Sequence, residues 1–170
     1  REALDFIWRN AKSLGVNRDQ ITVMGHSAGG HITQMMMGTK WAEFTAGLAA
    51  DLVTAGIPIS PLSYLEPVRL TEALNAGIGM TAAEADSQSP MVAHPPSTNA
   101  SQLVAVGGNE TEEFHRQAQM YVDTFSSDDR SMEIYVVPDA DHFDELNVLA
   151  DLNSPFFSKT LDIVRSTNRF

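Results

Sequence analysis

The chain has 170 residues, enough for one domain with a substantial core, and its 43% hydrophobic and 19% charged residues are ordinary for a folded domain. Lys and Arg total 11 against 22 Asp and Glu, giving a net charge of −11 that disfavours nucleic acid and anionic membrane surfaces as partners. The lack of cysteine excludes disulfides, thiolate zinc sites and a cysteine nucleophile but does not by itself assign a compartment, and no apolar run approaches membrane-spanning length. A cytoplasmic location is our expectation.

The first predicted element is a helix that ends at Gly15. Its apolar residues recur at helical spacing: Leu4, Ile7, Trp8, Ala11 and Leu14. This pattern is already under way at Arg1, without an N-cap. We therefore expect residues 1–170 to form the C-terminal part of a single larger domain.

The stretch "ITVMGHSAGG" at 21–30 contains a serine between two glycines. Residues 21–24 predict a buried strand, and residues 28–37 predict a helix with Ala28, Ile32, Met35 and Met36 as its apolar positions. Gly-x-Ser-x-Gly alone is a weak signal. Between a strand and a helix, however, it is typical of a nucleophile elbow, which indicates Ser27 as a nucleophile.

Further strands are predicted at 51–60, 102–106 and 132–137, with helices at 111–125, 144–150 and 156–167. Residues 61–100 are rich in Pro, Ala, Ser and Asn. They predict an excursion on the substrate side, with short helices near 67–76 and 81–87.

Each predicted strand is nearly continuously apolar, and helices separate the strands. This pattern favours an α/β fold with a mostly parallel sheet covered by helices on both faces. The strand before Ser27 would leave an open apolar edge. We therefore expect a preceding N-terminal segment or a second chain to complete the sheet; the sequence does not predict the oligomeric state.

Ser27 needs a base, and five histidines compete for that role. His142 is favoured because it follows the last predicted strand, at the carboxyl edge where α/β sheets collect functional groups. The alternative is a solvated loop histidine. His26 and His31 are interpreted as structural, while His94 and His115 fall in a loop and on a helix face.

An acidic run surrounds His142 and raises the possibility of a metal site. Its residues are Asp139, Asp141, Asp144 and Glu145, whose spacing matches neither a zinc nor a calcium template. We interpret the run as a solvated acidic loop and Met35–Met37 as core, and expect neither a metal nor another cofactor.

The orienting acid is predicted to be Glu110, which follows the strand at 102–106 and the pair Gly107-Gly108. Asp139 and Asp141 are nearer to His142 in sequence but poorly placed to reach Nδ1 while Nε2 faces the serine. Glu112 and Glu113 suit the first turn of a helix, where carboxylates meet the helix dipole favourably. Two alternatives stay open: Asp141 as the acid, and Glu110 as an exposed loop residue.

Four stretches carry a family resemblance: "GHSAGGH" at 25–31, "SP" at 89–90, "VAVGGNETEEFHRQAQMYVD" at 104–123 and "VVPDADHFDELN" at 136–147. They resemble the α/β-hydrolase superfamily and, within it, the kynurenine formamidase (arylformamidase) and carboxylesterase family. The resemblance implies a Ser27-His142-Glu110 triad, no cofactor, and a small-molecule ester or amide substrate. The alternative is a non-catalytic binding protein with the same fold.

Two features depart from the family pattern. The His-Gly-Gly loop that supplies part of the oxyanion hole is absent from these residues, and Tyr64 stands where relatives often carry Asp. The resemblance assigns one oxyanion donor to the backbone N–H of Ala28. The early strands and the second donor are expected to lie outside residues 1–170.

Overall fold

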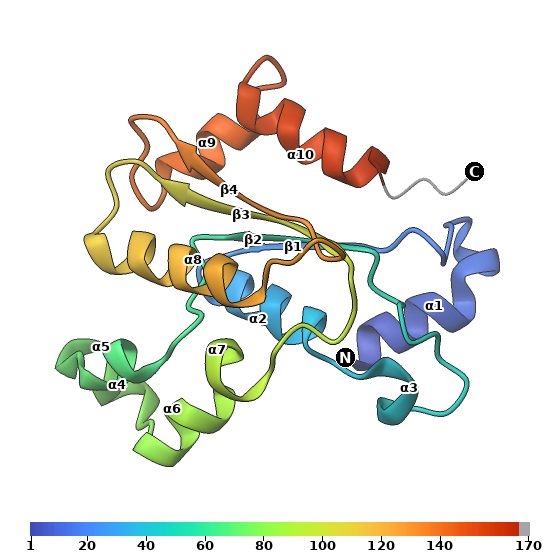
Figure 1. The fold of residues 1–170 in the computed structure, drawn as a ribbon, viewed down its shortest axis with the longest axis horizontal. Coiled ribbons are helices and arrows are strands. Elements are labelled where there is room, and N and C mark those ends of the chain that lie inside the picture. Colours follow the sequence, from blue (N-terminus) through green and yellow to red (C-terminus); the bar gives the residue numbers. More distant parts are fainter. Residues whose placement is uncertain (167–170) are drawn as a thin grey trace.

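A computed structural model of the chain describes residues 1–166. Its centre is a four-stranded sheet in the order β1-β2-β3-β4, with every neighbouring pair parallel (Figure 1). The strands are β1 (Thr22–His26), β2 (Ala55–Ile59), β3 (Ser101–Gly107) and β4 (Met132–Val137). The parallel α/β prediction is confirmed, although the strand expected at 51–60 is shorter.

Helices precede, separate and follow the strands. Those before β3 are α1 (Glu2–Leu14), α2 (Ala28–Met37), α3 (Trp41–Phe44), α4 (Glu66–Leu70), α5 (Glu72–Ile78), α6 (Ala82–Gln88) and α7 (Pro90–Ala93). Those after it are α8 (Glu112–Phe125), α9 (Asp144–Ala150) and α10 (Pro155–Ser166). Gly15 ends α1 in the left-handed conformation, with φ 68°, as its position predicts. The expected helix end at 167 lies outside the described residues.

Helices cover both faces of the sheet, with α2 and α8 on one side and α9 and α10 on the other (Figure 1). Ile57, Leu103 and Ala105 share a buried cluster with Phe156 of α10. Val104, which lies between Leu103 and Ala105 in β3, points the opposite way and packs against Tyr121 of α8. Because successive strand residues face opposite sides, a sheet buried on both faces requires the continuous apolar runs seen in the sequence.

The predicted apolar face of α2 is partly wrong. Ile32 is 55% exposed, whereas Thr33 and Gln34 are buried together with Met35–Met37. Met37 packs against Gly56 of β2, so closely that a Cβ on this glycine would lie 2.7 Å from the Met37 sulfur. The prediction of Met35–Met37 as core is therefore confirmed.

Residues 61–100 form four short helices, α4 to α7, instead of the two expected. Leu65, Val68 and Ala85 give this excursion a small core of its own. It attaches to the main body through contacts such as the Tyr64 backbone N–H, which donates to the Gln117 side chain of α8 at 2.8 Å. Its placement on the substrate side stays a prediction.

β1 is an outer strand of the described sheet, and its Met24 is 51% exposed. The expectation that further protein pairs with this strand stays a prediction. Within residues 1–166, no helix is long and apolar enough to cross a membrane.

Candidate active site

Ser27 lies in a sharp turn between β1 and α2. Its φ of 58° is rare for a residue with a side chain, and its backbone N–H donates to Ile59 O at 2.9 Å. Gly30 lets α2 come close to β2, because a Cβ there would lie 2.7 Å from the same carbonyl oxygen. The strand, the strained turn and the helix follow one another in the order expected of a nucleophile elbow.

Two neighbouring loops hold Glu110 and His142. The loop after β3 donates Gly108 N–H to Val137 O at 2.8 Å and Asn109 N–H to Ala140 O at 2.9 Å, which joins it to the loop after β4. Gly107 permits this approach, since a Cβ there would lie 2.6 Å from Ala140 O. The separation of Glu110 and His142 is thus fixed by backbone contacts.

The structure brings Ser27, His142 and Glu110 into one hydrogen-bonded series. His142 Nε2 lies 3.0 Å from Ser27 Oγ, and its Nδ1 lies 2.5 Å from Glu110 Oε1. The Glu110 side chain is 1% exposed and that of His142 25%. Glu110 Oε2 accepts the Gly107 N–H at 2.9 Å. This arrangement can orient an imidazole to take a proton from the serine.

Asp141, the alternative acid, has a different role. Its Oδ1 accepts the backbone N–H groups of Phe143 at 2.8 Å and Asp144 at 2.9 Å, where α9 begins. These N–H groups stabilise the carboxylate and lower the pKa of Asp141.

The other histidines lie apart from this series or beside it. His31 Nε2 contacts Gln88 O at 2.8 Å, His94 Nε2 contacts Ser87 O at 2.9 Å, and His115 lies on α8. His26 Nε2 donates to the His142 backbone carbonyl at 2.7 Å, and the two rings lie 4.5 Å apart. His26 is therefore a neighbour of the candidate base, with a contact that the sequence did not predict.

The interpretation of the acidic run as solvated is wrong for Glu145, which is fully buried. Its Oε2 lies 3.0 Å from Ser60 Oγ, and Ser60 Oγ also hydrogen-bonds Glu110 Oε2. One signal in the sequence could have indicated this burial. Glu145 is three and four residues before Val148 and Leu149, which pack on the core beneath α9.

His26, His142 and Glu145 offer ligand atoms within 4.8 Å of one another, the spacing of a possible metal site. However, His142 already uses Nδ1 for Glu110 and Nε2 for Ser27. His142 could bind a metal only by giving up one of these hydrogen bonds, so the group fits the serine series better than a metal centre.

The surroundings of His142 are aromatic on two sides. The Phe114 ring lies 4.9 Å from the imidazole, and the Phe143 ring, on a residue 73% exposed, lies 5.3 Å from it.

Ala28 is the first residue of α2, so its backbone N–H has no acceptor within that helix and can meet a developing negative charge beside Ser27.

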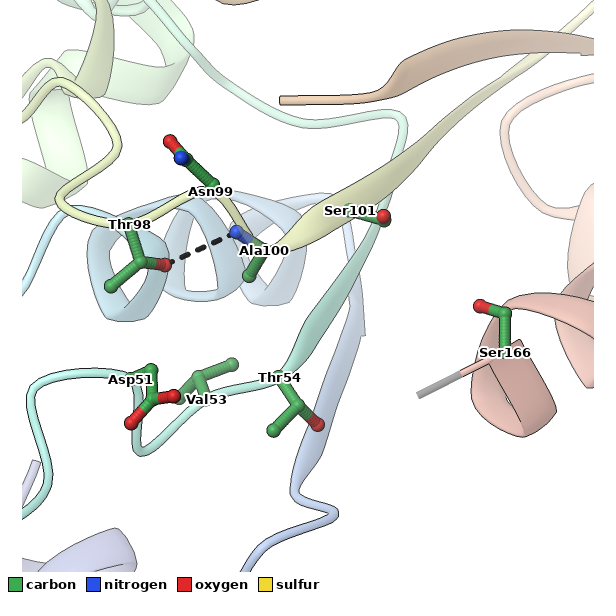
Figure 2. A pocket seen from close by; sticks show the side chains of 8 residues that line it. All are labelled: Asp51, Val53, Thr54, Thr98, Asn99, Ala100, Ser101 and Ser166. Carbon is green, nitrogen blue, oxygen red and sulfur yellow. Dashed lines mark hydrogen bonds between the residues drawn. The ribbon is translucent and has the colours of Figure 1, made fainter. Parts of the chain in front are cut away.

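A cavity of about 330 Å³ lies away from Ser27, and Figure 2 shows the side chains that line it. Thr54 precedes β2 and Ser101 begins β3, so this cavity adjoins the amino ends of the strands. The Ser27 site lies at their carboxyl ends, the edge at which parallel α/β sheets bind ligands. The cavity in Figure 2 is therefore separate from the candidate active site.

Solved structures share the overall fold. A candidate thioesterase of Silicibacter sp. is similar with a TM-score of 0.66 and 28% identity, over 91% of this chain and 57% of that one. An esterase of Pyrobaculum calidifontis gives a TM-score of 0.66 at 20% identity, over 97% and 57% of the respective chains. The chain has an α/β-hydrolase fold.

The chain is also similar in sequence to kynurenine formamidases. The kynurenine formamidases of Salmo salar and Danio rerio are 29% and 27% identical, over 75% and 76% of this chain. The aligned regions span 44% of each relative, less than half its length. The family model BD-FAE matches residues 1–51, which include the elbow. The predicted resemblance to a family of kynurenine formamidases and esterases is confirmed.

Proposed function

We propose that this chain carries the catalytic residues of a serine hydrolase acting on a small carboxylic ester or aryl formamide. The main support is the hydrogen-bonded series from Ser27 through both ring nitrogens of His142 to Glu110. The likeness to kynurenine formamidases and an esterase supports the two substrate classes.

In the proposed reaction, His142 Nε2 takes the proton of Ser27 Oγ as that oxygen attacks the substrate carbonyl carbon. The Glu110 carboxylate stabilises the resulting imidazolium. His142 then gives the proton to the leaving alcohol or amine, and an acyl or formyl group stays on Ser27. Water attacks this intermediate, again with His142 as base, and releases the acid and the free serine.

The Ala28 N–H would supply one donor to the oxyanion that forms in both steps. We propose that the second donor, and the protein that pairs with β1, lie outside residues 1–170. Phe114 and Phe143 would offer apolar contacts to an acyl or aryl group bound beside His142.

Ser27→Ala should abolish nearly all turnover while preserving the fold, because it removes only the attacking oxygen. The test measures hydrolysis of a short acyl ester and an aryl formamide by the purified full-length protein, including any segment or chain that pairs with β1, with a fluorophosphonate probe to locate the reactive serine. Labelling of a serine other than Ser27 would contradict the proposal.

The two rates also determine which carbonyl is preferred. If the protein binds both compounds, hydrolyses neither and resists the probe, the non-catalytic binding alternative replaces the proposed function.

A further inference from the structure

A second group of buried polar side chains lies behind Glu110. Ser60 directly follows β2 and Glu145 belongs to the first turn of α9, yet both are fully buried. Ser60 Oγ hydrogen-bonds Glu110 Oε2 and lies 3.0 Å from Glu145 Oε2. The hydrogen-bonded series that begins at Ser27 therefore continues beyond Glu110 to a second carboxyl group.

The number of protons in this group is constrained. A serine hydroxyl has one hydrogen, so Ser60 can donate to only one of the two carboxyl groups. At its other contact Ser60 must accept a hydrogen bond, which requires a proton on that carboxyl group. One of Glu110 and Glu145 must therefore be a neutral acid if both contacts are hydrogen bonds.

The surroundings favour Glu145 as the protonated partner. Burial raises the pKa of Glu145 to about 8, and the negative charges of Glu110 and Asp141 act in the same direction. Glu110, in contrast, accepts the Gly107 N–H and faces the imidazole of His142.

His26 is the basic side chain nearest to Glu145, with Nε2 3.0 Å from Glu145 Oε1. That nitrogen already donates to the carbonyl oxygen of His142 at 2.7 Å. Burial lowers the pKa of His26, which favours its neutral form. His26 therefore does not supply the positive charge that an ionised Glu145 would need.

We propose that Glu145 is a positioning residue: a neutral acid that donates to Ser60 Oγ, so that Ser60 donates to Glu110 and fixes its carboxylate toward His142. This inference rests on the proposed function of Ser27, His142 and Glu110. With Oε2 held by Ser60 and Gly107, the flexible Glu110 side chain keeps Oε1 directed at Nδ1. Ionisation of Glu145 would leave two carboxylates competing for one serine proton.

The test compares Glu145→Gln with Glu145→Leu in the purified full-length protein, including any segment or chain that pairs with β1. The Gln amide can donate to Ser60 as the acid does, so kcat should stay within roughly threefold of the original. Leu fills a similar volume but has no hydrogen-bond donor. The kcat of Glu145→Leu should therefore fall by roughly tenfold or more while KM changes little. Ser60→Ala interrupts the same series and should match Leu, which keeps the test open if Glu145→Leu does not fold.

The pH profile separates positioning from simple packing. The unsubstituted protein should lose kcat as the pH rises through about 8, where Glu145 ionises, and Glu145→Gln should lack that loss. The inference is overturned if Gln lowers kcat as much as Leu does, or if the two alkaline limbs are identical.

A measurement without turnover separates this inference from the proposed function. Difference infrared spectra of the unsubstituted protein and Glu145→Gln should contain a protonated carboxyl band at pH 7 that disappears above pH 8. Absence of the band at pH 7 overturns the inference. If the band is present but Ser27 neither turns over substrate nor reacts with a fluorophosphonate, the proposed function fails while the assignment of Glu145 as a neutral donor to Ser60 stands.

Discussion

Strained single residues mark one edge of the sheet. Among residues 1–166, the non-glycine residues with positive φ are Ser27 at 58°, Ser60 at 42° and Asp139 at 57°. Each follows the carboxyl end of a strand, and Ser27 and Ser60 belong to the series described above. Such conformations persist only where the surrounding contacts hold them, and they concentrate at functional sites. The strain therefore independently supports the position of the candidate site.

Glu110→Gln should lower kcat by roughly 10³ to 10⁴ while leaving the fold intact, as loss of the orienting carboxylate does in serine triads. The amide removes the negative charge that would stabilise the imidazolium of His142. Steady-state kinetics on whichever substrate class is hydrolysed, with circular dichroism as the folding check, measures the effect.

Asp141→Asn is the matched control, because it removes a carboxylate in the adjoining loop. Asn can still accept the two N–H groups at the start of α9, so kcat should remain close to that of the unsubstituted protein. The opposite ranking of the two variants would transfer the acid's role to Asp141.

The sequence predicted some of these residues and missed others for a physical reason. Ser27 and His142 occupy local contexts with their own signals, an elbow and a loop after a strand. Ser60 has no local signal, since its role arises from Glu110, which lies 50 residues away in the chain. Glu145 was obscured by its acidic neighbours, although its spacing to Val148 placed it on the buried face of α9.

At the level of elements, the elbow depends on close backbone approach between β1, α2 and β2. A Cβ on Gly25 would lie 2.4 Å from Gly29 O, and one on Gly30 would lie 2.7 Å from Ile59 O. These are backbone atoms, which cannot move aside without displacing an element. The same contacts explain why glycine rather than alanine stands at both positions.

Gly25→Ala and Gly30→Ala should each destabilise the fold by at least about 1–3 kcal/mol, the usual cost of overpacking. Gly29→Ala is the matched control, because a Cβ there meets no atom within 4 Å and alanine favours a helix. Urea unfolding of the three variants checks this ranking. Equal stability of Gly29→Ala and Gly30→Ala would show that α2 is not held as closely as described.

Element types were predicted better than their packing. The strand at 132–137 and the helix at 144–150 coincide with β4 and α9, because hydrophobic periodicity and loop residues define them locally. The exposure of Ile32 could not be predicted in the same way. Which side of α2 is buried depends on β2 and α7, elements that follow much later in the chain.

For the whole molecule, the two outer strands of the described sheet differ in their charged side chains. β4 carries Glu133, which pairs with Lys159 of α10. β1 has the sequence TVMGH, with no acidic residue, Lys or Arg, and its Met24 is exposed. Charged residues discourage pairing with further strands, so β1 is the outer strand better suited to accept one. This contrast supports the proposal that protein outside residues 1–170 pairs with β1.

The ionisation of Glu145 should make the free energy of unfolding depend on pH. Its pKa is near 4.5 when exposed and about 8 when folded, so between these values the folded chain keeps a proton that the unfolded chain has released. Raising the pH through this range therefore favours unfolding. Glu145→Gln has no such proton, and other titrations largely cancel in a comparison of the two proteins.

The free energy of unfolding of Glu145→Gln should therefore rise relative to that of the unsubstituted protein between pH 4.5 and 8. The slope should reach at most about 1.4 kcal/mol per pH unit, the limit for one proton, and the difference should level off outside this range. Urea unfolding of the two proteins across this pH range measures the difference. A slope of opposite sign would indicate that the folded protein stabilises Glu145 as an anion, paired with a protonated His26.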